Sequence, residues 1–258
     1  MNETNLRPWT IPLLGLLVPG CLLCAWWLAS AQGWLPAQRL PAPADVAIAL
    51  WQLLNSGTLA GHLAISLQRV LIGFFLGTLL GLVLGAAMGV STTLKAYLYP
   101  SFKALAYIPL LGWLPIMMLL LGIGEPLKFV LIAKSSLVPV AINTCRGIEN
   151  VPAQYLDLAR IYKLSRRQVL TRIILPAAFP SIWSGVRYGL TYSWLVLVVV
   201  ELLASSEGLG FLMVNAQQLF QLDVVMATVL IIAIIGVSLD RLLQYIEKRL
   251  GQWRKSAF

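Results

Sequence analysis

Two long stretches of this 258-residue chain carry no charged residue, and this feature constrains the fold more than any other. Residues 8–38 and 70–94 contain no Asp, Glu, Lys or Arg, and a helix needs roughly 20 apolar residues to cross a bilayer. The whole chain is 59% hydrophobic and 11% charged, whereas soluble domains are about 45–50% apolar and about 25% charged. One globular core could not bury this much apolar surface. The composition therefore predicts a polytopic helical membrane protein and argues against a soluble enzyme.

Six apolar segments fit this class. We predict an all-α fold in which the whole chain, 1–258, forms one transmembrane domain with six transmembrane helices. The expected spans are about 11–30, 70–90, 104–123, 127–145, 182–204 and 222–240. Cys21 and Cys24 form a C-x-x-C inside the first span, where we expect two small apolar residues, and no metal site is predicted.

The basic residues are distributed unevenly along the chain. With the N-terminus inside, the cytoplasmic segments are 1–10, 91–105, 145–187 and 240–258, which hold fifteen of the 19 Lys and Arg residues. Cytoplasmic loops of membrane proteins carry such an excess. The pattern predicts that both termini are cytoplasmic, and it accounts for the net charge of +9 without a nucleic-acid partner.

The second expected span carries five glycines spaced four residues apart: Gly73, Gly77, Gly81, Gly85 and Gly89. Small residues at this spacing let two helix backbones approach closely in a membrane. This glycine stripe predicts a helix–helix interface, with a partner helix from this chain or from a second copy.

The longest basic loop, about 147–176, has the pattern of two short helices. From Ala153 the polar and apolar residues alternate with helical period, and Ser165 with Gln168 matches a capping box that begins a second helix. We expect Pro176 and Pro180 to end that helix at Leu175. Such a unit either docks a cytoplasmic partner or packs on its own bundle; a DNA-reading helix–turn–helix is disfavoured because two spans tether it.

Within this loop, a specific family resemblance appears. The run from Asp157 to Pro176, D-L-A-R-I-Y-K-L-S-R-R-Q-V-L-T-R-I-I-L-P, resembles the E-A-A loop of ABC importer permeases. Further blocks resemble the branch that imports aliphatic sulfonates, taurine and nitrate, and the sulfonate-type permeases look closest. These blocks are Leu63–Gly73, Pro109–Pro115, Pro176–Gly189 and Trp194–Gly210.

The resemblance implies a type I (MetI-like) ABC importer permease in the bacterial inner membrane. Such permeases act as dimers, here a homodimer, above two cytoplasmic ATPase subunits, and a periplasmic binding protein delivers the substrate. This sequence has no G-x-x-x-x-G-K-[ST] phosphate-binding loop, so ATP and Mg would bind to the partner subunits and the chain would be non-catalytic. The implied cargo is a small anion, an aliphatic sulfonate first, with nitrate, taurine or an amino-pyrimidine as alternatives.

The resemblance also implies which residues couple the permease to its ATPase: Asp157, Leu158, Ala159, Arg160, Lys163, Ser165, Leu175 and Pro176. Three of these depart from the motif. Asp157 stands in place of Glu, Leu158 in place of Ala, and Lys163 in place of the Gly that permits a turn. Either Lys163 makes that turn by other means, or the helix continues to Leu164.

Charged and polar residues within the spans are candidates for the translocation pathway, because a charge inside a membrane is costly. The candidates are Lys134, Tyr192, Ser193, Trp194 and Glu201. Lys134 and Glu201 either form a structural ion pair, or Lys134 faces the pathway and attracts an anionic head group. Tyr192 and Ser193 either line a cavity or form hydrogen bonds between helices.

Two other classes are less consistent with the sequence. An ion-gradient secondary transporter often shows internal repeats and paired broken helices, and neither is visible. A membrane-embedded enzyme needs a catalytic constellation, and a single histidine, His62, with ten carboxylates mostly in loops does not provide one.

Overall fold

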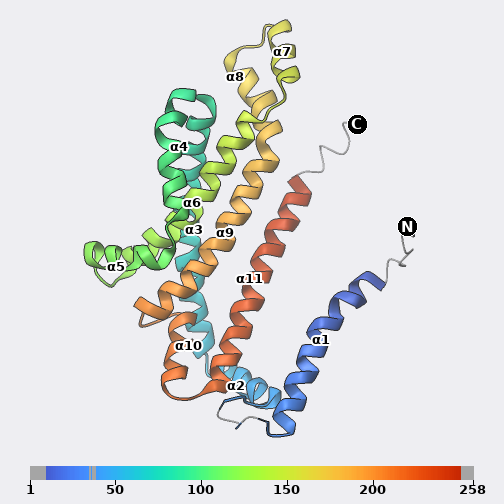
Figure 1. Ribbon diagram of the computed structural model, residues 1–258, viewed down its shortest axis with the longest axis vertical. Helices are drawn as coiled ribbons and strands as arrows, with labels where there is room; N and C mark the ends of the chain where they lie inside the picture. Colours follow the sequence, from blue (N-terminus) through green and yellow to red (C-terminus); the bar gives the residue numbers. More distant parts are fainter. Residues whose placement is uncertain (1–9, 35, 37–38, 251–258) are drawn as a thin grey trace. The chain divides into compact units, whose positions relative to one another are not determined.

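The computed structural model describes residues 10–34, 36 and 39–250, with the backbone alone for residues 10–16 and 250. Every regular element in this described part is a helix, so the predicted all-α class is confirmed (Figure 1). The elements are α1 Thr10–Ala31, α2 Pro43–Asn55, α3 Thr58–Val90, α4 Thr92–Tyr107, α5 Leu110–Leu121, α6 Glu125–Glu149, α7 Ala153–Ile161, α8 Arg166–Val169, the π-helical segment η1 Leu170–Ile174, α9 Leu175–Ala204, α10 Leu209–Gln218 and α11 Leu222–Leu250. Residues 1–9 and 251–258, which contain the termini expected to be cytoplasmic, lie outside the described residues.

The helices form two compact units. The smaller unit contains the described residues up to Ala60 together with Leu212–Ile231. In it, the indole Nε1 of Trp26 donates to the Pro41 carbonyl oxygen at 3.1 Å, and α2 packs against Ala227. The larger unit contains Gly61–Phe211 and the rest of α11 from Ile232, and it holds every site described below.

Among the described residues, four helical segments are long and apolar enough to cross a membrane: α3, α6, the continuous segment Arg166–Ala204, and Leu222–Arg249. The expected spans at 70–90, 127–145, 182–204 and 222–240 lie within them. In α1, the part with described side chains, Leu17–Ala31, is apolar but shorter.

The expected third span, 104–123, differs from the prediction. Here α4 ends at Tyr107 and α5 begins at Leu110 after a bend of 102°, so the pair forms a broken or re-entrant span at most. Ile108 and Pro109 are extended, with ψ of 115° and 152°. A proline disfavours the helical conformation of the preceding residue and has no amide hydrogen to donate. The uninterrupted helix was therefore a wrong prediction, because the apolar run concealed the break at Pro109.

The expected helix end at Leu175 is also wrong. Helix α8, the π turn η1 and α9 are continuous from Arg166 to Ala204. The π turn comes directly before Pro176, which stands in the first turn of α9 and cannot donate to the carbonyl four residues earlier. The π-helical turn coincides with this missing backbone hydrogen bond, and the helix continues through it into α9.

The glycine stripe of α3 lies against α6. A Cβ atom added at Gly73 would lie 2.6 Å from Ile132 Cγ2, and one at Gly89 would lie 2.8 Å from Ile148 Cβ. At Gly77 the added atom would overlap the Ala133 carbonyl oxygen. No side chain larger than hydrogen fits such an approach, so the stripe lets α3 pack closely on a helix of the same chain.

Candidate functional site

Helices α7 and α8 lie at one end of the larger unit, beyond the ends of α6 and α9 (Figure 1). Ala159, at the centre of the predicted coupling motif, is 4% exposed. Four large apolar side chains along one side of α7 and at its C-cap are exposed: Tyr155, Leu158, Ile161 and Tyr162. An apolar set gathered on one short polar-flanked helix is typical of a docking surface.

Lys163 makes the turn that glycine makes in the motif. Its φ is +50°, in the left-handed region that non-glycine residues rarely adopt. The Leu164 amide donates to the Ala159 carbonyl at 3.0 Å, and the Lys163 amide donates to the Arg160 carbonyl at 3.0 Å. These two bonds are the Schellman pattern that ends a helix. Of the two alternatives left open by the sequence, α7 therefore ends at Ile161 and Lys163 turns the chain.

The remaining coupling residues lie on either side of this turn. Asp157 and Arg160 pair at 3.1 Å on the exposed surface of α7. The capping box of Ser165 and Gln168 is confirmed: Ser165 Oγ accepts from the Gln168 amide at 3.3 Å, and the Ser165 amide donates back to the Gln168 side chain at 2.9 Å. Leu175 and Pro176 begin α9.

Lys134 lines a cavity of about 420 Å³ between the α4–α5 turn, α6 and α9. It is the only charged residue that lines this cavity within the described part of the chain. Its ammonium lies 5.1 Å from the ring centroid of Trp113 on α5, a cation–π distance. The bend at Pro109 places Trp113 beside Lys134, so the break that the sequence concealed helps to build the site.

Other polar groups of the Lys134 cavity come from α6 and α9. Tyr192, a predicted pathway residue, lines the cavity, as do Ser135 and Asn143. The Asn143 amide nitrogen donates to the Pro139 carbonyl at 2.8 Å, which fixes the side chain within its own helix. The rest of the lining is apolar and includes Leu131 and Val138. The cavity therefore combines one cation with hydrocarbon walls.

Ser193 and Trp194 do not line the Lys134 cavity. Ser193 is fully buried, and its hydroxyl lies 3.2 Å from that of Ser135 and bonds to the Ile132 carbonyl at 3.3 Å. Trp194 donates to the Ile232 carbonyl at 3.2 Å and lines a second groove between α9 and α11. Ser193 therefore makes the hydrogen bonds between helices that the sequence left as an alternative.

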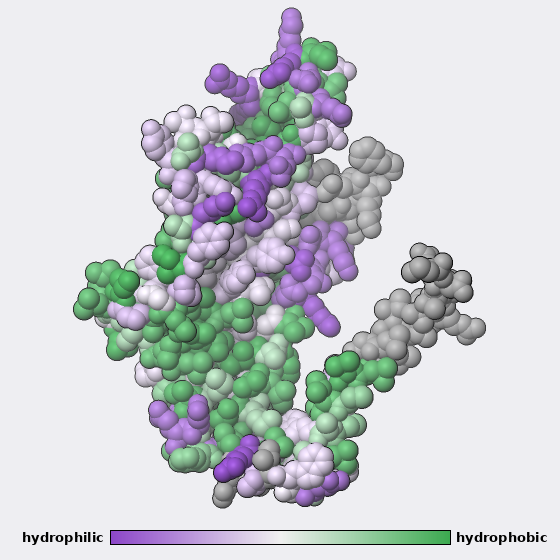
Figure 2. Space-filling model, viewed as in Figure 1, coloured by the Kyte–Doolittle hydropathy of each residue, from purple (hydrophilic) through white to green (hydrophobic). Residues whose placement is uncertain are grey.

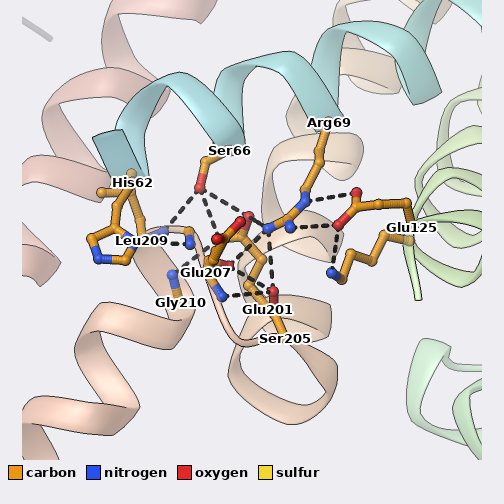
Figure 3. A network of polar contacts seen from close by, with 11 residues as sticks. His62, Ser66, Arg69, Glu125, Glu201, Ser205, Glu207, Leu209 and Gly210 are labelled. Carbon is orange, nitrogen blue, oxygen red and sulfur yellow. Dashed lines mark hydrogen bonds and ion pairs between the residues drawn. The ribbon is translucent and has the colours of Figure 1, made fainter. Parts of the chain in front are cut away.

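Glu201 is fully buried in a network of polar contacts (Figure 3). Arg69 Nη1 of α3 donates to Glu201 Oε1 at 2.9 Å, and the Ser66 hydroxyl lies 2.8 and 2.9 Å from its two oxygens. The Gly210 amide donates to Glu201 Oε2 at 3.0 Å. Both Glu201 oxygens thus accept hydrogen bonds, which compensates the cost of burying the charge.

Arg69 extends this network to α6 and to the turn after α9. Its Nε and Nη2 form a bidentate pair with Glu125 at 2.9 and 2.5 Å, and Lys128 Nζ lies 2.8 Å from the same carboxylate. Arg69 Nη1 also donates to the Glu207 carbonyl at 2.8 Å. In this way one arginine, 4% exposed, joins three helices and a turn.

The network rejects the ion pair between Lys134 and Glu201 that the sequence left open. Glu201 pairs with Arg69, while Lys134 faces Trp113 and the cavity. Sequence reasoning missed Arg69, Ser66 and Trp113 as members of these sites. A signal existed for Arg69: it stands at the start of a charge-free segment, where a buried guanidinium requires a carboxylate partner.

Comparison with known proteins shows the family of the chain. Residues 77–252 match the family model described as the binding-protein-dependent transport system inner membrane component. The chain is 40% identical to an aliphatic sulfonates transport permease protein of Escherichia coli, with 97% of this chain and 95% of that protein covered. It is 37% identical to the taurine transport system permease protein of Escherichia coli (90% and 86% covered), and 34% identical to the nitrate import permease protein of Synechocystis (94% and 88% covered).

Among solved structures, an amino acid ABC transporter with histidines has a similar fold. The TM-score is 0.62 at 19% identity, covering 78% of this chain and 97% of that one. At this identity the similarity concerns the fold alone.

Proposed function

Because this chain belongs to the family of binding-protein-dependent transport system inner membrane components, we propose that it moves an aliphatic sulfonate through a site centred on Lys134. It is a multi-pass inner-membrane permease of an ABC importer. The observation that carries the substrate proposal is the Lys134 cavity, which offers one cation and apolar walls.

The chemistry of the cavity favours an aliphatic sulfonate over the other candidates. A sulfonate group would accept from the Lys134 ammonium while its alkyl chain lies on Leu131 and Val138. Nitrate has no apolar part that could pack against the apolar lining of the cavity. Taurine carries an ammonium group, and no carboxylate lines the cavity within the described residues to receive it. An amino-pyrimidine has no anionic group for Lys134.

We propose the following assembly. Two copies of the chain associate with two cytoplasmic ATPase subunits, which bind ATP and Mg, and a periplasmic protein delivers the sulfonate. Both termini and α7 are cytoplasmic. The support is the exposed apolar face of α7 and the absence of a phosphate-binding loop from the sequence. Closure of the ATPase pair would move α7, and α9 would transmit the motion because it continues from α8 without a break.

The substrate proposal is tested by uptake into proteoliposomes that contain the complete importer. We expect Lys134→Met to reduce the kcat/KM for ethanesulfonate about 10- to 100-fold, because it removes one charge-assisted hydrogen bond. Lys134→Arg should keep most of the wild-type kcat/KM. ATP hydrolysis without substrate is the control for assembly. Equal uptake by both variants and the wild type would contradict the proposed site; uptake of nitrate in preference to ethanesulfonate would contradict the substrate.

The coupling proposal is tested at Ala159. Because this side chain is buried within the loop, Ala159→Asp should displace α7 and uncouple ATP hydrolysis from uptake, while the spans remain folded. The matched control is Gln154→Ala, an exposed change on the same helix outside the coupling set, which should retain coupling. Normal transport by Ala159→Asp with its ATPase still bound would show that α7 is not the coupling helix.

A further inference from the structure

A second group of cations surrounds Tyr99 on α4. The ammonium groups of Lys95 and Lys103 lie 5.3 and 5.7 Å from the centroid of its ring. From α6, Arg146 Nη2 donates to the Tyr99 hydroxyl oxygen at 3.2 Å. Three cations thus converge on one aromatic side chain, whose position is fixed because its ring packs on the buried cluster around Met88.

The three cations around Tyr99 outnumber the carboxylates that pair with them among the described residues. Glu149 pairs with Lys95 at 2.6 Å. Arg146 stands in the last turn of α6, where the helix dipole favours a cation. For Lys103 and Arg146, however, no carboxylate lies within ion-pair distance in the described part of the chain. Lys103 and Arg146 therefore carry positive charge that an anion bound beside Tyr99 would neutralise.

The Tyr99 group continues directly from the Lys134 cavity. Asn143 and Ala106 line the cavity, and Arg146 and Lys103 stand three residues farther along α6 and α4, toward the end that carries α7. Residues three apart are neighbours on one helix face. Figure 2 shows hydrophilic side chains gathered over α4 and α6 between the apolar part of the unit and α7. The cations therefore follow one face from the cavity toward that end.

We propose that Lys103, Arg146 and Tyr99 form an exit subsite, which binds the sulfonate group after it leaves Lys134. This inference rests on the proposed function for the identity of the anion. The Lys103 ammonium, the Arg146 guanidinium and the Tyr99 hydroxyl together offer donors for all three sulfonate oxygens. A phosphate group of a membrane lipid has the same acceptor chemistry, so the experiment separates these two sources.

The experiment measures how fast a cysteine at position 103 reacts with charged reagents in the complete importer. The three native cysteines are replaced by alanine and Lys103→Cys is introduced. The anionic probe is 2-sulfonatoethyl methanethiosulfonate, itself a small alkanesulfonate, and the cationic probe is 2-(trimethylammonium)ethyl methanethiosulfonate. Because Arg146 and Lys95 remain, we expect the ratio of anionic to cationic rates to exceed that of the control by at least about fivefold.

The control cysteine is Lys248→Cys on α11. It is exposed and stands beside Arg249, which pairs with Tyr245 at 2.7 Å, so it offers one cation and one tyrosine without the convergence seen at Tyr99. Adding Arg146→Gln to Lys103→Cys should bring the rate ratio down to the control value. Ethanesulfonate should slow the anionic probe at position 103 and leave position 248 unaffected.

Each result has one consequence. Equal rate ratios at positions 103 and 248 would overturn the subsite. Protection by phosphatidylglycerol, with none by ethanesulfonate or nitrate, would overturn the exit role and assign the cations to lipid. Protection by nitrate but not by ethanesulfonate would support the subsite and contradict the sulfonate as cargo, so failures of the two proposals remain distinguishable.

Discussion

The two ends of the larger unit contain the same kinds of charged residue in opposite surroundings. At the end where α3, α6 and α9 meet, which we call the Arg69 end, Arg69 and Glu201 are 4% and 0% exposed. At the α7 end, Arg160 and Asp157 are 81% and 62% exposed. Buried pairs depend on every partner, whereas exposed pairs contribute little because water screens them.

This difference indicates a division of roles. The Arg69 network joins α3, α6 and α9 to the turn that contains Glu207. Any relative movement of these helices at the Arg69 end would leave a buried charge without its partner. At the α7 end a short helix with an exposed apolar face is held by a single turn at Lys163. The first end is therefore built to stay fixed and the second to dock a partner. The predictions below test this contrast, from the largest expected effect to the smallest.

Removing Arg69 should have the largest effect. Arg69→Met leaves the Glu201 carboxylate buried without its cation, so we expect the free energy of unfolding in detergent to fall by about 3–5 kcal/mol. The double variant Arg69→Met with Glu201→Gln should recover part of this loss, because no charge then stays unpaired between them. A loss below about 1 kcal/mol for Arg69→Met would mean that the Arg69 end is no more dependent on its charges than the exposed end.

Removing the Ser66 hydroxyl should have an intermediate effect. This hydroxyl donates to Glu201 and accepts from the Leu209 amide at 2.9 Å, so Ser66→Ala removes one donor from Glu201 and leaves the buried Leu209 amide without its acceptor. We expect a loss of about 1–3 kcal/mol in thermal unfolding. Ser238→Ala is the matched control, because that exposed hydroxyl bonds only within α11. Equal losses at both serines would contradict the buried network as the cause.

The contrast between the ends also explains what the sequence could predict. Local patterns specified local structure: the capping box of Ser165 and the period of α7 are properties of a few neighbouring residues. The bend at Ile108 was not predicted because the long apolar run is a stronger signal for a membrane span than one proline is for a break. The partner of Glu201 was missed because it lies 132 residues away, and spacing along the chain does not determine which helices become neighbours. The cavity beside Lys134 depends on the same long-range packing.

Replacing Lys163 by glycine should stabilise the α7 end slightly. A left-handed φ costs a non-glycine residue roughly 1–2 kcal/mol, and the greater freedom of unfolded glycine offsets part of the gain. We expect a net gain of about 0.5–1 kcal/mol, seen as roughly two- to fivefold slower hydrogen exchange of the α7 amides. Lys163→Ala, which removes the charge but keeps the strain, should show no slowing. If both variants slow exchange equally, the charge of Lys163 and not its backbone destabilises α7.

The smallest effect is expected for the pair Asp157 and Arg160. Both side chains are mostly exposed, and their spacing of three residues on one helix places the charges in contact at 3.1 Å. A double-mutant cycle with Asp157→Ala and Arg160→Ala should give a coupling energy of about 0.3–0.5 kcal/mol, measured by hydrogen exchange of α7.

Raising the salt concentration to about 1 M should abolish this coupling energy, because the Debye length then falls to about 3 Å. The same salt should leave the Arg69→Met loss almost unchanged, since water and ions do not reach that pair. A coupling energy above about 2 kcal/mol in α7, insensitive to salt, would show that burial does not set the difference between the two ends.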